Sequence, residues 1–245
     1  IRASEKKGLF KWLSTIKVDA ICMQEVRATE EQIQGDSFHI DKYQRYLSDA
    51  SRKGYSGVCI YVKEKPSKVS KTFGSKFFSD EGRFIEIDLP KLKLVSVYFP
   101  SGSSSDDRQK VKYDFMNKFE KYLKNIKKDS KPTIICGDWN IVHKEIDIKN
   151  WKSNQKNSGC LPREREWLDK IFYKFGYVDA FRAINNKPNN YTWWSNRGRA
   201  WENNVGWRID YQAITPHENI QITKAEIYKK KRFSDHSPLI IDYRL

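Results

Sequence analysis

The stretch Thr133-Ile134-Ile135-Cys136-Gly137-Asp138-Trp139-Asn140 decides the fold and points to the chemistry. Four residues suited to a buried strand run into a glycine and then two hydrogen-bonding side chains, which is typical of a central strand that ends at a functional edge. On an extended backbone, Asp138 and Asn140 would project to the same side and could hold one water molecule between them. Taken alone, an ordinary polar turn is the simpler interpretation of 137–140.

Length and charge suggest one large domain that binds a polyanion. The 245 residues contain no Pro/Gly/Ser-rich linker and no internal repeat, so we expect a single domain over residues 1–245. Lys and Arg number 46 against 31 acids, which gives a net charge of +15. A strong positive field favours nucleic acid as partner, with membrane headgroups as the competing polyanion. Eight Trp residues supply rings that can stack on bases.

Several signals exclude other classes of protein. The chain has no apolar run long enough to span a membrane and no signal-peptide core at its start, so we expect a protein that is cytoplasmic, nucleoid-associated in a bacterium, or otherwise intracellular. We also expect a monomer without a membrane partner. The four cysteines lack a C-x-x-C spacing. They predict reduced, buried thiols rather than a zinc site or a catalytic cysteine.

Hydrophobic periodicity predicts helices interleaved with two sets of short strands. A long amphipathic helix begins near Asp106, and its Lys-rich face is most simply solvated. Several strands are joined by turns too short for a crossover, which favours a pair of packed sheets flanked by helices over one parallel sheet. The expected helices are 4–16, 106–126 and one from Pro162; the expected strands are 20–23, 57–62, 83–89, 93–99, 133–136, 191–194, 207–214, 220–227 and 239–243.

Four acids are expected at strand ends, namely Glu25, Asp138, Asp210 and Asp235. An acid among apolar β-residues is costly to bury unless it is paired or bound to a metal, so a converging divalent-cation site is the economical explanation. Magnesium suits carboxylates, and no His/Cys cluster is present for zinc. The isolated histidines, which are His39, His143 and His217, are expected at the surface, whereas His236 lies beside Asp235.

At this point the residues match a known family over nearly the whole chain. The chain resembles exonuclease III and the class II apurinic/apyrimidinic endonucleases of the exonuclease-endonuclease-phosphatase superfamily. The matching motifs, in the family's order, are Met23-Gln24-Glu25, Tyr98-Phe99-Pro100, Gly137-Asp138-Trp139-Asn140, Asn204-Val205-Gly206-Trp207-Arg208-Ile209-Asp210-Tyr211 and Phe233-Ser234-Asp235-His236-Ser237-Pro238. Each fragment alone is weak, but together they are highly specific.

The resemblance implies an α/β fold, a four-layer αββα sandwich of two mixed β-sheets flanked by helices. It implies a Mg²⁺-dependent phosphodiesterase, with Mn²⁺ as a substitute ion. The enzyme would cut double-stranded DNA on the 5′ side of abasic sites, leave a 3′-hydroxyl, and trim blocked or recessed 3′ ends as a 3′–5′ exonuclease.

The same resemblance implies a role for each motif residue. Glu25 resembles the principal metal ligand and Asp235 an acid near the metal and the leaving group. Asp138 resembles the residue that deprotonates the attacking water, with Asn140 as its neighbour. The remaining roles are a phosphate contact for Tyr98, a phosphate donor for His236, a tautomer-fixing acid for Asp210, DNA contacts for Asn154 and Asn157, an abasic-sugar pocket wall for Trp207, and a duplex-pressing loop for Trp193 and Arg197 to Trp201.

The chain departs from the family pattern at two places. Family members place a strand ending in Asn-x-Asn-Gly before Ile-Arg-Ala, and this chain begins at Ile1-Arg2-Ala3, so we expect that strand and its asparagine to be missing. The Ser101 to Ser105 loop lacks the asparagine and arginine of some relatives.

Two other functions stay open at this level. Superfamily branches that hydrolyse phosphoinositides or sphingomyelin share the carboxylate, Asn and His core. A non-catalytic DNA-binding module would also be strongly basic. The tryptophans, too, have an alternative interpretation as core residues.

Overall fold

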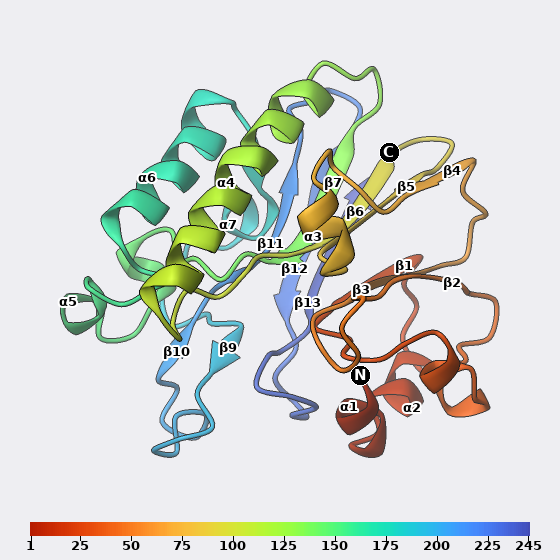
Figure 1. Cartoon of the computed structure of the whole chain (residues 1–245), viewed down its shortest axis with the longest axis horizontal. Helices are drawn as coiled ribbons and strands as arrows, with labels where there is room; N and C mark the ends of the chain where they lie inside the picture. Colours follow the sequence, from red (N-terminus) through yellow and green to blue (C-terminus); the bar gives the residue numbers. More distant parts are fainter. The chain divides into compact units, whose positions relative to one another are not determined.

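The computed structural model describes residues 1–245, which group into two compact units (Figure 1). The first unit comprises residues 1–98 and 135–137, and the second comprises 99–134 and 138–245. Strand β7 (Thr133–Asp138) therefore contributes residues to both. Each unit combines β-sheets with helices, which confirms the expected α/β class with sheets flanked by helices.

The first unit contains two groups of antiparallel strands. Its elements after the first helices are β1 (Ala20–Gln24), η1 (Glu31–Ile33), η2 (Asp36–Phe38), β2 (Gln44–Ser48), β3 (Val58–Val62), β4 (Lys68–Ser70), α3 (Lys76–Asp80), β5 (Phe84–Asp88) and β6 (Lys93–Tyr98). One sheet has the order β1-β3-β2, with Met23 opposite Cys59. In the other, β5 lies between β4 and β6. All five residues of β3 are buried, as expected for a central strand.

The predicted helix 4–16 is two short helices, so that prediction is wrong in its extent. Gly8 adopts φ +82° and separates α1 (Arg2–Lys6) from α2 (Leu9–Leu13). A left-handed residue cannot continue a right-handed helix, and glycine adopts it without steric cost. The resulting turn lets Phe10 and Leu13 pack in a core with Tyr61.

The second unit is built around the long helix and the strands that follow it. Its elements are α4 (Asp106–Ile126), β7, η3 (Glu145–Asp147), α5 (Trp151–Asn154), α6 (Pro162–Asp169), η4 (Lys170–Lys174), β8 (Val178–Asp179), α7 (Ala180–Ile184), β9 (Trp193–Trp194), β10 (Gly206–Trp207), β11 (Asp210–Ile214), β12 (Gln221–Ile227) and β13 (Leu239–Arg244). Strand β11 lies between β7 and β8, while β9 pairs with β10 and β12 with β13.

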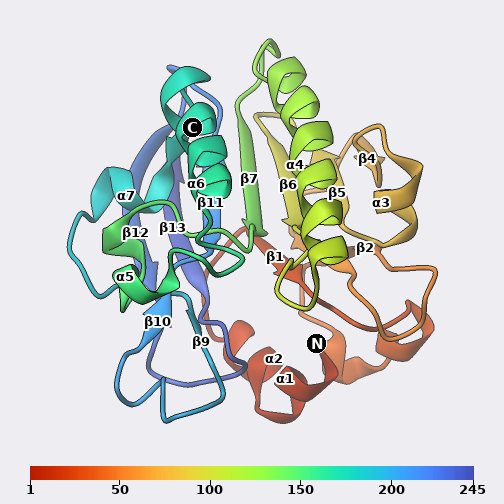
Figure 2. The ribbon, with the colours of Figure 1, turned by 60° about the vertical axis from the view of Figure 1, so that its left-hand side comes forward.

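Helix α4 forms as the apolar period predicts. The Ser105 hydroxyl accepts a hydrogen bond from the Arg108 backbone N–H at 3.2 Å, which caps its first turn. Its buried stripe includes Phe115 and Phe119, and α4 and α6 lie side by side over β7 and β11 (Figures 1 and 2). Neither α4 nor any other helix is long and apolar enough to cross a membrane.

The predicted strand 207–214 is interrupted at Arg208, which is fully buried. Its guanidinium donates to Asp147 at 2.7 Å and to Asp179 at 2.7 Å, and its backbone N–H donates to the Asp147 carbonyl at 2.7 Å. Arg182 also donates to Asp147, at 2.6 Å. Burial alone would raise the pKa of Asp147, but the two guanidinium groups lower it to about 2. This network sets the start of β11, where Asp210 lies.

Replacing Arg208 with methionine should destabilise the protein by about 3–5 kcal/mol, because it leaves buried carboxylates without their charge partner. The free energy of unfolding in urea at pH 7 measures this loss. Arg163→Met is the matched control, since Arg163 is exposed and ion-pairs with no acid. We expect the control to lose about 1 kcal/mol or less. Equal losses in the two variants would contradict the structural role of Arg208.

The cysteine prediction is confirmed in part. All four thiols are free, and Cys59 and Cys160 are buried. Cys22 and Cys136 are only partly buried in the structure, although both lie in strands.

Candidate active site

The tip of β7 is fixed by the residue between its two polar side chains. Trp139 is fully buried, and its ring stacks parallel to Phe99 at 5.2 Å and to Phe172 at 6.2 Å. Its backbone N–H donates to the Ile209 carbonyl at 2.9 Å. The aromatic stack therefore holds the backbone rigidly between Asp138 and Asn140.

Asp138 and Asn140 touch directly rather than across a water molecule, and the extended geometry expected for them is wrong. Asn140 adopts φ +52°, a left-handed conformation that asparagine tolerates better than most residues. Its side-chain amide donates to Asp138 Oδ2 at 3.2 Å and to the Phe99 carbonyl at 3.0 Å. The Asn140 backbone N–H donates to Asp138 Oδ1 at 2.8 Å. Both oxygens of the Asp138 carboxylate are thus oriented by one residue.

The left-handed turn at Asn140 is held by a buried cation that the sequence did not reveal. Lys112 Nζ donates to the Asn140 carbonyl at 2.7 Å and forms an ion pair with Glu164 at 2.5 Å. Both side chains of this pair are 0% exposed. Lys112 is therefore an exception to the solvated Lys-rich face expected for α4. Burial lowers its pKa, and the Glu164 carboxylate counters part of that effect.

Glu164 extends the constraint into the loop that follows. Its carboxylate also accepts hydrogen bonds from the backbone N–H groups of Gly159 at 2.7 Å and Leu161 at 3.0 Å. Gly159 has φ +91°, and a Cβ there would lie 2.9 Å from the Asn140 carbonyl oxygen and 3.1 Å from Trp207 Cζ3. Only glycine lets the loop pass between the β7 tip and the Trp207 ring.

His236 is oriented toward Asp138 by Asp210. Its Nδ1 lies 2.9 Å and 3.1 Å from the two Asp210 carboxylate oxygens. Because a carboxylate only accepts, Nδ1 is the donor. The other ring nitrogen, Nε2, lies 3.9 Å from Asp138 Oδ2, beyond hydrogen-bonding distance. Its N–H is aimed at the Asp138 side of the site, where a ligand oxygen could accept it.

The surrounding carboxylates keep this histidine positively charged. Burial lowers the pKa of His236, but the nearby Asp210, followed by Asp138 and Asp235, outweighs that effect and raises it to about 10. Its side chain is still 24% exposed, so a ligand can reach it. At neutral pH the site therefore presents an imidazolium donor beside a carboxylate.

Asp235 and the predicted tryptophans lie around this pair. Trp193 Nε1 donates to Asp235 Oδ2 at 3.1 Å. Trp193 is the cross-strand partner of Trp207, and the two rings meet edge to face at 5.9 Å. Both are partly buried against a small core that contains Ile209. Trp207 therefore belongs to that core and also presents surface, and its role as a pocket wall stays a prediction.

Asn154 and Asn157 lie together in the loop that Gly159 closes. Asn157 Nδ2 donates to Asn154 Oδ1 at 2.8 Å, and Asn154 Nδ2 donates to the Asn150 carbonyl at 2.9 Å. Asn157 is exposed, so its contacts do not bury it. The structure brings this asparagine pair onto the segment that runs beside Trp207.

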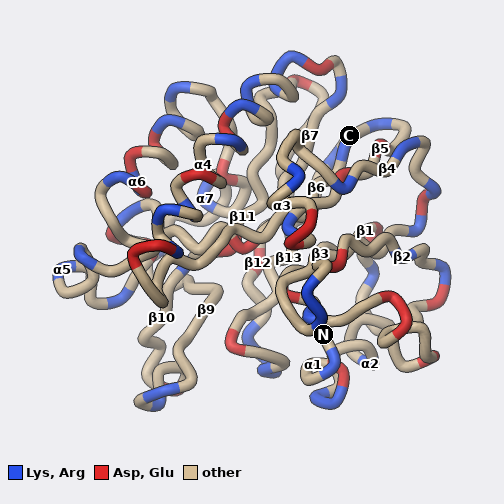
Figure 3. Tube along the Cα trace, in the orientation of Figure 1, with Lys and Arg blue, Asp and Glu red and all other residues tan.

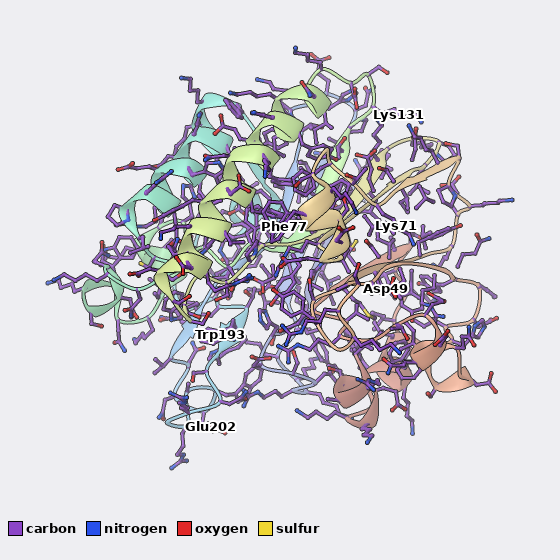
Figure 4. All side chains as sticks on the ribbon, in the orientation of Figure 1. Asp49, Lys71, Phe77, Lys131, Trp193 and Glu202 are labelled. Atoms are coloured by element: carbon purple, nitrogen blue, oxygen red, sulfur yellow. The ribbon has the colours of Figure 1, made fainter.

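The hairpin loop of β9 and β10 carries the remaining predicted contacts. Figure 4 shows Trp193 at the base of this hairpin and Glu202 at its outer end. Trp194 is buried and packs edge to face on Trp201 at 4.5 Å. Arg197 is exposed on the loop. Trp193 and Trp194 alternate between partial exposure and burial, as an extended strand requires.

Glu25 and Tyr98 lie in the first unit. Glu25 follows β1 with φ +55° and forms an ion pair with Arg27. Tyr98 ends β6, and the Arg83 guanidinium lies 5.0 Å from the centre of its ring. Both side chains are partly exposed, as residues that meet a ligand must be.

The acidic residues fit a hard cation by chemistry, although no group of three or more Asp, Glu, His or Cys residues is arranged to hold a metal. Magnesium usually keeps several waters and is bound through one or two carboxylates plus substrate phosphates, so it does not need such a cage. Asp235, which Trp193 orients, is a carboxylate of this kind.

Sequence reasoning missed buried residues whose hydrogen bonds hold the backbone of the site in place. The spacing of Lys112 to Phe115 and Met116 places it on the buried stripe of α4, and this periodicity could have identified it. The Thr192 hydroxyl accepts from the backbone N–H groups of Ile209 at 3.1 Å and Asp210 at 3.2 Å. His143, expected at the surface, is buried against Asp169 at 2.9 Å, so that prediction is wrong.

The charge on His236 gives a direct prediction. Because its folded pKa exceeds the unfolded value of about 6.5, its contribution to stability is complete below pH 6.5 and is lost as the pH rises through about 10. NMR titration of the metal-free protein should find imidazolium at pH 8. Asp210→Asn should lower the pKa by roughly 1 to 3.

His143 is an internal control in the same spectra. Burial lowers its pKa, and Asp169 counters part of that effect, so it should titrate below His236 and stay unchanged in Asp210→Asn. A His236 pKa near that of a free histidine would refute the proposed orientation by Asp210.

Comparisons with known proteins identify the family of this chain. Residues 2–236 match the model of the Endonuclease/Exonuclease/phosphatase family. The chain is 32% identical to the exodeoxyribonuclease of Bacillus subtilis (strain 168), over 96% of this chain and 91% of that protein. It is 31% identical to the DNA repair nuclease APEX1 of Danio rerio, over 98% and 78%.

Solved structures show the same fold. An AP endonuclease from Archaeoglobus fulgidus matches with a TM-score of 0.89 and 27% identity, over 100% of this chain and 96% of that one. The 3′-5′ exonuclease NExo from Neisseria meningitidis matches with a TM-score of 0.87, at 18% identity, over 99% and 95%. With the family model covering nearly all of its length, this chain belongs to the endonuclease/exonuclease/phosphatase family.

Proposed function

We propose that this protein is a DNA repair phosphodiesterase that cleaves the backbone on the 5′ side of abasic sites in duplex DNA and leaves a 3′-hydroxyl. The observation that carries the proposal is the His236 ring, oriented by Asp210 at 2.9 Å and facing Asp138 at 3.9 Å. Relatives named as exodeoxyribonuclease and DNA repair nuclease support the reaction class. We propose a 3′–5′ exonuclease activity beside it. The proposed enzyme acts as a monomer.

The reaction divides between the two sides of the site. Asp138, held by Asn140, takes a proton from a water molecule whose oxygen then attacks phosphorus. The bond from phosphorus to the upstream 3′ oxygen breaks, and that oxygen takes a proton from solvent water and leaves as the 3′-hydroxyl. His236 donates from Nε2 to a phosphate oxygen, where negative charge develops. Tyr98 is proposed as a further phosphate contact.

The proposed cofactor is Mg²⁺, for which Mn²⁺ could substitute. Asp235 would supply a carboxylate oxygen, in keeping with the few protein ligands that Mg²⁺ takes. Glu25 is proposed as a metal ligand from its motif alone. When bound, the ion would neutralise charge on the reacting phosphate and its leaving group.

The tryptophan cluster supports the choice of an abasic substrate. Trp207 offers a partly exposed ring with Gly159 packed against its edge, so the wall is flat and fixed. Such a wall accepts a flipped sugar without a base, whereas a normal nucleotide costs unstacking energy to extrude. Asn157 and the loop with Arg197 and Trp201 are proposed to hold the flanking backbone. The same wall would be of little use to an enzyme acting on lipid headgroups.

The test is cleavage of two substrates, a duplex with one abasic site and an undamaged duplex with a recessed 3′ end, each with Mg²⁺ and with EDTA. We expect cleavage 5′ to the abasic site with Mg²⁺ and none with EDTA. Asp138→Asn should reduce turnover by about 10²-fold or more while DNA binding persists, because it removes the base and keeps the shape.

Asp169→Asn is the control variant, because Asp169 is also paired with a histidine but lies outside the site. It should cleave like the wild type. DNA binding without cleavage by the wild type would favour a non-catalytic module, and equal cleavage in EDTA would overturn the metal requirement.

A further inference from the structure

The loop between β12 and β13 contains the basic run Lys229-Lys230-Lys231-Arg232. None of these four residues belongs to the candidate active site. The run leads directly into the turn that carries Asp235 and His236. Lys229, Lys230 and Lys231 are exposed. In Figures 1 and 3 this loop lies at the same end of the second unit as the β9–β10 hairpin loop, and both carry basic residues.

The run is held in place rather than loosely tethered. Tyr228 and Phe233, which flank it, stack with ring centres 6.2 Å apart and planes 9° from parallel. The Tyr228 backbone N–H donates to the Pro238 carbonyl at 2.9 Å, which continues the β12–β13 pairing. Phe233 is buried. Ordering the lysines on a ligand would therefore cost less backbone entropy than ordering a free loop.

Arg232 joins this run to the hairpin loop. Its guanidinium donates to Asn196 Oδ1 at 2.8 Å and lies 5.2 Å from the centre of the Trp201 ring. Its Nε donates to the Ser234 carbonyl at 3.1 Å, and the Ser234 hydroxyl accepts from the His236 backbone N–H at 2.9 Å. All the groups that accept hydrogen bonds from Arg232 are neutral, so they do not compensate the positive charge of its guanidinium.

The lysines of α4 provide the contrast. Lys110, Lys118 and Lys124 each form an ion pair with an acid three or four residues away, namely Asp107, Asp114 and Glu120. That helix face is a balanced, solvated surface. Lys229, Lys230 and Lys231 form no ion pair of this kind. The acids that flank the run, Glu226 and Asp235, contact Lys224 and Trp193 instead.

We propose that Lys229, Lys230 and Lys231 form a second phosphate-binding surface, which grips the DNA backbone a few nucleotides from the scissile bond. This proposal rests on the proposed function. It extends that function by stating which surface of the protein the DNA backbone contacts. Five residues span at most about 18 Å, so Lys231 can reach phosphates within about five nucleotides of the one that His236 contacts, at roughly 3.4 Å per nucleotide along the axis. The contacts are to phosphates and carry no sequence preference.

The test is the salt dependence of binding to an undamaged blunt duplex, followed by fluorescence anisotropy in EDTA from 50 to 200 mM salt. Each lysine that contacts a phosphate adds about 0.9 to the slope of log affinity against log salt concentration. Lys229→Gln/Lys230→Gln/Lys231→Gln should therefore lower the magnitude of the slope by about 0.9 to 2.7. With three contacts, the wild type loses about 40-fold more affinity over this range than the variant.

The matched control is Lys127→Gln/Lys128→Gln/Lys131→Gln, which changes the net charge equally. These residues follow α4, and Figure 4 places Lys131 at the end of the second unit opposite Trp193. The control should keep the wild-type slope. Thermal unfolding confirms that both variants fold.

An unchanged slope in the loop variant, or an equal decrease in both variants, would overturn the proposal. So would a loop variant that binds DNA normally but loses binding to vesicles of equal parts anionic and zwitterionic phospholipid. Cleavage of abasic duplex by the wild type tests the proposed function separately, because the slope is measured on undamaged DNA.

Discussion

The hydrogen bond from the buried Lys112 ammonium to the Asn140 carbonyl is the constraint on which the site depends. A cation in the interior persists only with a charge partner, and Glu164 supplies it at 2.5 Å. The same carboxylate holds the backbone at Gly159. One buried pair therefore fixes two segments, the turn that orients Asp138 and the loop that carries the asparagines. The loop then lies between that turn and Trp207.

The opposite wall of the site is fixed by a second set of buried polar groups. Arg208, locked on Asp147 and Asp179, ends β10 and lets β11 begin at Asp210. The Thr192 hydroxyl accepts the backbone N–H of Asp210, and Asp210 in turn orients His236. The nucleophile side and the donor side thus come from separate networks that meet across 3.9 Å between His236 and Asp138. This separation of an acceptor from a charged donor suits attack on a phosphate bound between them.

The sequence predicted the elements whose signals are local. Helix α4 and the strands β1, β3, β5, β6, β7, β12 and β13 follow from periodicity and from flanking Gly and Pro residues. The break at Arg208 was not predictable in this way, because its partner Asp147 lies 61 residues away. The left-handed turn at Asn140 depends likewise on Lys112, 28 residues earlier. Motif order identified Asp138, Asn140, Asp210, Asp235 and His236. Lys112, Glu164 and Thr192, which help to hold them, belong to no motif and depend on tertiary contacts. The roles of Glu25 and Tyr98 stay predictions.

Separating stability from positioning tests the central claim, that the Lys112 ammonium orients the turn at Asn140. Lys112→Met leaves the buried Glu164 carboxylate without a charge partner and should lower the free energy of unfolding by about 3–5 kcal/mol. Lys112→Met/Glu164→Gln removes both charges and keeps an acceptor for the Gly159 N–H, so it should regain most of that stability. The decisive measurement is single-turnover cleavage of abasic duplex by the double variant at a temperature where it is folded. The account predicts a rate that stays well below wild type although stability returns, because no cation holds the Asn140 carbonyl. A rate that recovers together with stability would contradict it.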